Sequence, residues 1–161
     1  MADFVFNIAA GHVAEYARRV NANDPANSAL IVVAIQTSGI EADSVLRDYD
    51  DLGALLAAAN NEATNSGYAR KVIDNTGGIT INVDDTNNWN DIDMPDQTWT
   101  AVAAGGGAWS KLLICYDADT TAGADANIVP CVALDFAVTP DGTDIVWQLH
   151  ADGFYRADAE P

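Results

Sequence analysis

The stretch WSKLLICYDADTTAGADANIVPCVALDFAVTPDGTDIVWQLH, from Trp109 to His150, decides the fold class of this chain. Its apolar and β-branched runs are separated by residues that favour turns, which is typical of strands joined by loops. The three strand-like runs span 109–117, 130–138 and 144–150. In the turn between the last two, Pro140 presets its own backbone angle and Gly142 accepts a positive one. We therefore predict an antiparallel hairpin around this turn.

Earlier parts of the chain contain both helix-like and strand-like segments. Apolar residues at helical spacing predict an amphipathic helix over 9–21, and Asp50 or Asp51 is placed to cap a short helix further on. Between these helices, the β-branched cluster within 28–39 predicts a buried strand. Further strands are predicted at 68–74, 78–84 and 97–103.

Because the helices come first and the strands later, we predict a β-rich α+β fold, with short N-terminal helices followed by an antiparallel β-sandwich or barrel. A chain of 161 residues with 49% apolar content is long enough for one domain with its own core. We expect a single domain over 1–161, with a helix-containing part at 1–65 and a β-rich part at 66–161. No apolar run approaches the roughly 20 residues of a membrane-spanning helix, and we see no secretion signal at the N-terminus.

The chain is strongly acidic. Lys and Arg number 7 against 24 Asp and Glu residues, which gives a net charge of −17. A protein this negative repels nucleic acid phosphates and anionic membranes, so we expect neither as a partner. Self-repulsion also destabilises the compact state, and a saline environment, bound cations or a basic partner surface would each relieve it.

An acidic loop between Cys115 and Cys131 looks more like a site than any other part of the sequence. Asp117 and Asp119 resemble the start of an EF-hand calcium loop, but the sixth and twelfth positions hold alanine and isoleucine where glycine and glutamate are needed. An irregular calcium site that includes Asp125 is therefore the alternative to a solvated hairpin loop. We expect the cysteines to be reduced thiols, with a disulfide as the alternative if their strands are neighbours.

No catalytic or cofactor-binding motif is evident in the sequence. His12 and His150 have no local signature around them, and the glycines within 103–109 lack the lysine of a phosphate-binding loop. A second acidic stretch, at 83–96, is expected to be a loop whose Asx residues hydrogen-bond to their own backbone, with an irregular calcium site again as the alternative. We therefore expect a non-enzymatic protein without a bound metal or cofactor.

Tryptophans and adjacent basic residues are the best candidates for an interaction surface. Trp99 and Trp147 alternate with apolar residues in strands and are expected in the core, whereas Trp89 and Trp109 fall in polar or Gly-rich loops. The basic candidates are two adjacent pairs, Arg18 with Arg19 and Arg70 with Lys71.

Several segments, spread over nearly the whole chain, have a sequence that is typical of a known family. They include FVFNIAAGHVAEYARRVNANDPANSALIVV near the N-terminus, YDDLGALLAAANNEAT in the middle, and KLLICYDADTTAGADANIVP and DFAVTPDGTDI later. In this order, the segments resemble a family of tailed-bacteriophage virion structural proteins encoded near the major capsid protein.

The resemblance implies a capsid cement or decoration protein on the capsid surface of the virion. Such a protein would bind the lattice of the major capsid protein, stabilise the head and, as a further expectation, associate with itself as a homo-oligomer. The expected contact residues are Arg18, Arg19, Arg70, Lys71, Trp89 and Trp109. The alternatives are a tail or head-to-tail structural protein and a carbohydrate-binding adhesion module, which would need an exposed aromatic platform.

Overall fold

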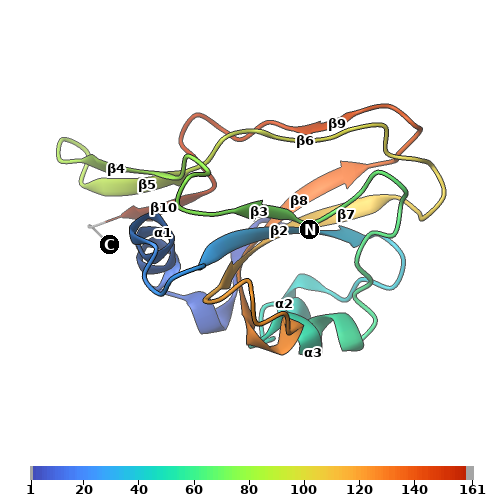
Figure 1. Cartoon of the computed structure of the whole chain (residues 1–161), viewed down its shortest axis with the longest axis horizontal. Helices are drawn as coiled ribbons and strands as arrows, with labels where there is room; N and C mark the ends of the chain where they lie inside the picture. Colours follow the sequence, from blue (N-terminus) through green and yellow to red (C-terminus); the bar gives the residue numbers. More distant parts are fainter. Residues whose placement is uncertain (1, 159–161) are drawn as a thin grey trace.

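A five-stranded antiparallel sheet forms the centre of the computed structural model, which describes residues 2–158 (Figure 1). Its strand order is β1-β8-β7-β2-β3. The strands are β1 (Phe4–Val5), β2 (Ala29–Gln36), β3 (Lys71–Ile73), β7 (Trp109–Asp117) and β8 (Ile128–Val138). Because β2 lies between β7 and β3, the helix-containing and β-rich parts of the chain share one sheet.

The two central strands are buried on both faces of this sheet. All nine residues of β7 and seven of the eight residues of β2 are buried. Burial on both faces explains why 29–35 in β2 and 112–116 in β7 are continuous runs without an alternation of apolar and polar residues. The two faces contribute to separate core clusters: Ile114 and Cys131 belong to one cluster, and Leu113 and Cys115 to the other.

Two short helices and the N-terminal segment cover one face of the central sheet (Figure 1). These helices are α2 (Asp43–Leu46), which was not predicted, and α3 (Leu52–Ala57). Asp51 caps α3, as predicted, because its carboxylate accepts a hydrogen bond from the Ala54 N–H at 2.7 Å. Leu52 and Leu55 are buried against the sheet together with Phe6.

The other face is covered by α1 (Val13–Ala22) and by two smaller sheets. The three-stranded one has the order β10-β5-β4, and the two-stranded one pairs β6 with β9. Their strands are β4 (Thr80–Asp84), β5 (Trp89–Asp93), β6 (Gln97–Trp99), β9 (Ile145–Trp147) and β10 (Tyr155–Asp158). Trp99 and Trp147 are buried in the core, as predicted.

The helices are all short. The predicted N-terminal helix exists, but it begins at Val13, after Gly11, which has a φ of 78°. Two 3-10 turns, η1 (Asn7–Ala9) and η2 (Asp125–Asn127), complete the set. Within residues 2–158, no helix combines the length and the apolar character needed to cross a membrane.

The predicted β-rich α+β class with antiparallel sheets is confirmed, but the predicted hairpin of β8 with β9 is wrong. β9 pairs with β6, and β8 pairs with β7 and β1. The turn has the expected chemistry, because Gly142 has a φ of 99° and the Thr143 N–H donates to Asp141 Oδ1 at 3.0 Å. Its backbone bonds go to Val102, just after β6, so the turn carries the chain from one sheet to another.

The prediction of a loop over 83–96 is also wrong in part, because β5 lies within it. The turn between β4 and β5 behaves as expected, with Asp84 Oδ1 accepting hydrogen bonds from the backbone N–H groups of Thr86 and Asn87. Ile92, which is fully buried, is the position that anchors β5 to the core.

Candidate interaction surface

The three-stranded sheet β10-β5-β4, called the small sheet below, projects from one end of the molecule (Figure 1). Its strand register places Ile81, Ile92 and Tyr155 side by side on one face. These three side chains pack on the core cluster that lies between the small sheet and the central sheet. The part of this face that is nearest the central sheet is apolar because it belongs to the hydrophobic core.

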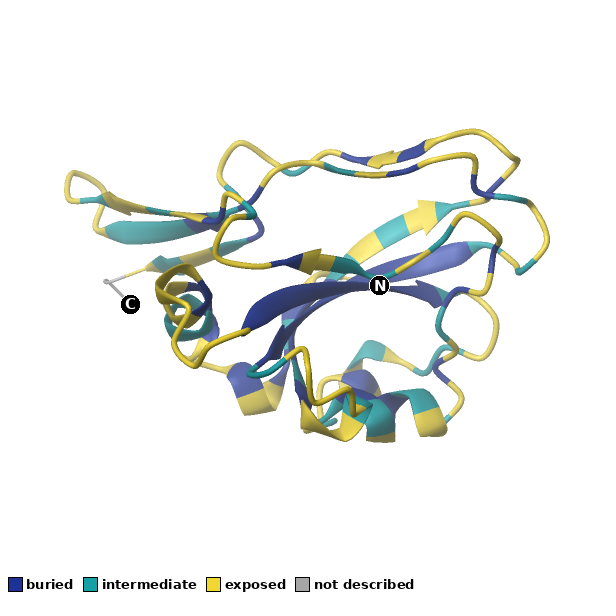
Figure 2. Cartoon of the chain, in the orientation of Figure 1, coloured by how far each residue is buried: buried dark blue, intermediate teal, exposed yellow. Residues whose placement is uncertain are grey.

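The same face continues outward beyond the core. Two positions further along the strands, Val83, Asn90 and Ala157 lie side by side. They and Trp89 line a hollow of about 360 Å³, called the tip hollow below. Its acidic lining residues are Asp84, Asp85 and Asp158. This end of the molecule is mostly exposed or half-buried, in contrast to the central strands (Figure 2).

Trp89 is held in place by Arg156. The guanidinium carbon lies 3.9 Å from the centroid of the indole ring, which is a cation–π contact. Arg156 is itself fixed by Asp91, with 2.6 Å between Nε and Oδ1, and this hydrogen bond raises the pKa of the arginine. One face of the Trp89 ring is thus covered by the guanidinium.

Arg18 and Arg19 lie on the exposed side of α1 and share one partner. Arg18 Nη2 lies 2.6 Å from Glu15 Oε2, and Arg19 Nε lies 3.0 Å from Glu15 Oε1. Hydrogen bonds from Arg18 and then Arg19 lower the pKa of Glu15. The pair is accessible, but half of its charge is already neutralised within the helix.

Arg70 has a structural role that its sequence context did not reveal. Its guanidinium joins two carboxylates, with 2.6 Å to Glu62 Oε2 and 2.5 Å to Asp125 Oδ1. The neighbouring Lys71 donates to the Thr98 carbonyl at 2.6 Å and lies 5.3 Å from the centroid of the Trp99 ring. Both side chains therefore connect parts of the fold.

The acidic loop joins the antiparallel strands β7 and β8 and is therefore a hairpin connection. Asp125 is engaged by Arg70, and Asp117 Oδ1 accepts a hydrogen bond from the Asp119 N–H at 3.0 Å. Hydrogen bonds from Thr121 lower the pKa of Asp119. Across the part of the chain that the structure describes, no three acidic, histidine or cysteine residues are grouped as a metal site.

Trp109 does not lie in an exposed loop, so its prediction as a contact residue is wrong. It is the first residue of β7 and is 1% exposed. Its Nε1–H donates to Asn65 Oδ1 at 2.8 Å, and its ring meets the Trp99 ring edge-on, with 5.3 Å between centroids. Trp109 is a core residue whose polar atom has a buried partner.

Lys111 was not singled out in the sequence, although it is a charged residue in the middle of an apolar strand. Its side chain is fully buried, with Nζ 3.2 Å from Asp43 Oδ1 and in contact with the carboxylate of Asp135. The backbone N–H of Ala2 donates to Asp43 Oδ2 at 2.9 Å, and Lys111 Nζ lies 5.3 Å from the centroid of the Phe4 ring. Lys111 thus fastens the N-terminal segment and α2 to the central sheet.

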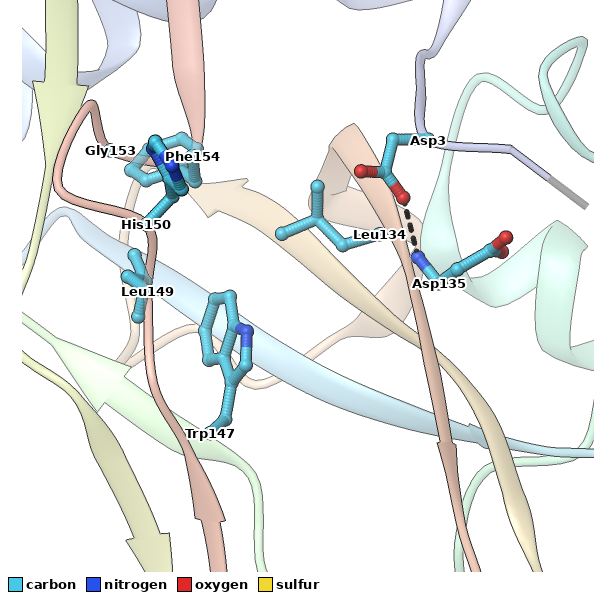
Figure 3. Close-up of a pocket in the computed structure, with 8 residues that line it drawn as sticks. All are labelled: Asp3, Leu134, Asp135, Trp147, Leu149, His150, Gly153 and Phe154. Carbon is cyan, nitrogen blue, oxygen red and sulfur yellow. Dashed lines mark hydrogen bonds between the residues drawn. The ribbon is translucent and has the colours of Figure 1, made fainter.

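A second cavity, of about 200 Å³, lies beside β8 and the segment before β10 (Figure 3). Asp3, Asp135 and His150 contribute polar groups, and Trp147 and Phe154 contribute apolar surface. The two carboxylates do not form a free acid–base pair, because Asp3 Oδ1 accepts from the Asp135 N–H at 2.7 Å and the Asp135 side chain binds Lys111.

The two cysteines are free and buried, as expected for reduced thiols. Although they lie in neighbouring strands, Cys115 points into one core cluster and Cys131 into the other. Burial raises the pKa of Cys131 to about 12 and that of Cys115 well above its usual value. Both thiols are therefore packing groups and poor nucleophiles.

The six predicted contact residues do not come together in one site: Arg18 and Arg19 lie on α1, Arg70 and Lys71 at β3, Trp109 in the core and Trp89 at the tip hollow. The tip hollow was missed because its apolar residues are scattered over three strands. Comparison of the chain with protein-family models, curated proteins and solved structures gave no match.

Proposed function

We propose that this protein is a non-enzymatic structural protein of a bacteriophage virion, which binds the major capsid protein lattice on the outside of the head and stabilises it. The sequence resemblance motivates this proposal. The structural observation that supports it is that the few basic side chains are already engaged by contacts within the protein.

Five of the seven basic side chains are paired with carboxylates: Arg18, Arg19, Arg70, Lys111 and Arg156. The remaining two, Arg47 and Lys71, each contact a backbone carbonyl and an aromatic ring. Little positive charge is left to balance the other carboxylates, so the outer surface is strongly negative.

A surface of this kind serves a protein displayed in many copies on a particle. Like charge keeps decorated particles apart, and it attracts the protein to a basic surface on the shell. A protein that binds the assembled lattice and not its free subunits stabilises the lattice through the free energy of binding.

The copy number of this chain relative to the major capsid protein in purified particles, measured by quantitative mass spectrometry, tests the proposal. We expect a ratio near one or a simple fraction set by the lattice. A handful of copies per particle would favour a tail or head-to-tail protein. Complete absence from particles would overturn the virion assignment, and binding to a glycan array would then test the adhesion module.

A further inference from the structure

We propose that the tip hollow of the small sheet is the surface that contacts the capsid, and that it takes an extended segment of the partner with an apolar side chain flanked by Lys or Arg. This inference rests on the proposed function, because the partner is the capsid. Three independent features of the small sheet support it.

The first feature is exposed apolar surface. Val83 is 68% exposed, which is the highest value among the exposed large apolar side chains of the described residues. Val83 and Ala157 both pair with Asn90, so they lie on one face of the small sheet and an apolar side chain from a partner would meet both. Trp89, which follows Asn88 and precedes Asn90 in the chain, points to the opposite face of the small sheet, where the Arg156 guanidinium lies 3.9 Å from the centroid of its ring.

The second feature is an open sheet edge. β4 pairs with β5 on one side and, within residues 2–158, with no strand on the other. Its sequence, TINVD, has no proline or lysine that would protect this edge from another strand. An extended segment that aligns with β4 would use the unpaired backbone groups, and its alternate side chains would reach the hollow.

The third feature is polar and charged groups that favour a cationic partner. The Oδ1 atom of Asn90 is buried and accepts no hydrogen bond within the described residues. At the rim, Asp85 and Asp158 are exposed, and the nearby Arg156 is already paired with Asp91. A Lys or Arg side chain would supply both a donor for Asn90 and positive charge for the aspartates.

Binding of purified protein to particles that lack it, measured by co-sedimentation, tests this assignment. Val83→Asn should weaken binding about tenfold or more, and the matched Val146→Asn on β9 should leave it unchanged. Asp85→Lys should weaken binding and reduce its dependence on salt, in contrast to Asp50→Lys on the far side of the fold. Unchanged thermal unfolding of each variant would show that its fold is intact.

Photo-crosslinking identifies the partner segment directly. A benzophenone amino acid in place of Val83 should crosslink to a capsid peptide that contains Lys or Arg, and the same group in place of Val146 should not. If the wild-type protein binds but the Val83 variant binds equally well and does not crosslink, the tip hollow is wrong and the proposed function stands. If the wild-type protein does not bind particles at all, both proposals are overturned.

Discussion

The Arg70 guanidinium lies 2.5 Å from the Asp125 carboxylate and joins the start of β3 to the loop between β7 and β8. Replacing Asp125 with Asn should lower the free energy of unfolding by about 1 kcal/mol, a small loss because water partly screens the pair. Urea denaturation measures the loss, and Asp50→Asn is the control at an exposed carboxylate. The loss should be equal in EDTA and in calcium; a loss seen only in calcium would reveal a metal site in this loop.

The same contact should make stability depend on pH in the acid range. The hydrogen bond from Arg70 lowers the pKa of Asp125 in the folded protein. Its contribution is therefore complete above the unfolded pKa of about 3.9 and is lost as the pH falls through the lower folded value. The difference in stability between wild type and Asp125→Asn should shrink toward zero below about pH 4. A difference that grows on acidification would contradict this assignment.

Lys111 should be far more sensitive to substitution than Lys71. Replacing Lys111 with Met leaves Asp43 and Asp135 without their shared cation, and we expect a loss of about 2–3 kcal/mol in the free energy of unfolding. Lys71→Met removes a basic residue that has no carboxylate partner among residues 2–158, and it should cost much less. Equal losses in chemical denaturation would show that the ion pairs of Lys111 stabilise the fold no more than the polar contacts of Lys71 do.

The thiols should be unreactive until the protein unfolds. Cys115 and Cys131 are buried with raised pKa values, and they occupy opposite faces of the central sheet. An aromatic disulfide reagent at pH 8 should therefore label neither cysteine in the native protein and both in guanidinium chloride. Mass spectrometry without reductant should find no link between them; such a link in folded protein would be incompatible with this strand packing.

Salt should stabilise the isolated protein at neutral pH. The net charge of −17 produces self-repulsion, which added NaCl screens. The melting temperature should rise by several degrees between low salt and about 0.5 M NaCl, with most of the rise at the low end, where the Debye length shortens fastest. A melting temperature that falls over this range would mean that the ion pairs of Arg70 and Lys111 outweigh the repulsion.

The strands were easier to predict than their partners. β7 coincides with the predicted run at 109–117 because nine buried positions in succession are visible in one sequence. The pairing of β9 with β6 was not visible, because turn residues specify that the chain reverses and not which strand it meets. That choice is made by tertiary packing, which places Trp147 opposite Gln97 and Ile145 opposite Trp99.

The surroundings of the candidate contact residues were harder to predict, because they too are set by tertiary packing. The glycines before Trp109 indicated an exposed loop, but the hydrogen-bond partner of its indole is Asn65, far away in the sequence. Trp89 lines the tip hollow, but it is the first residue of β5 and does not lie in the predicted loop. Val83 and Ala157, which also line the hollow, were not selected, because only the register of the small sheet brings them to one face on either side of Asn90.

The position of β2 in the central sheet affects how the chain can fold while it is being synthesised. Ala29 pairs with Asp117, so the main neighbour of β2 leaves the ribosome long after β2 itself. Until then, a strand destined for burial on both faces has only the short β3 beside it. Chains that end before β7 should therefore aggregate or be degraded, because they cannot form a stable partial fold. We therefore expect only chains that extend past β7 to complete the sheet around β2.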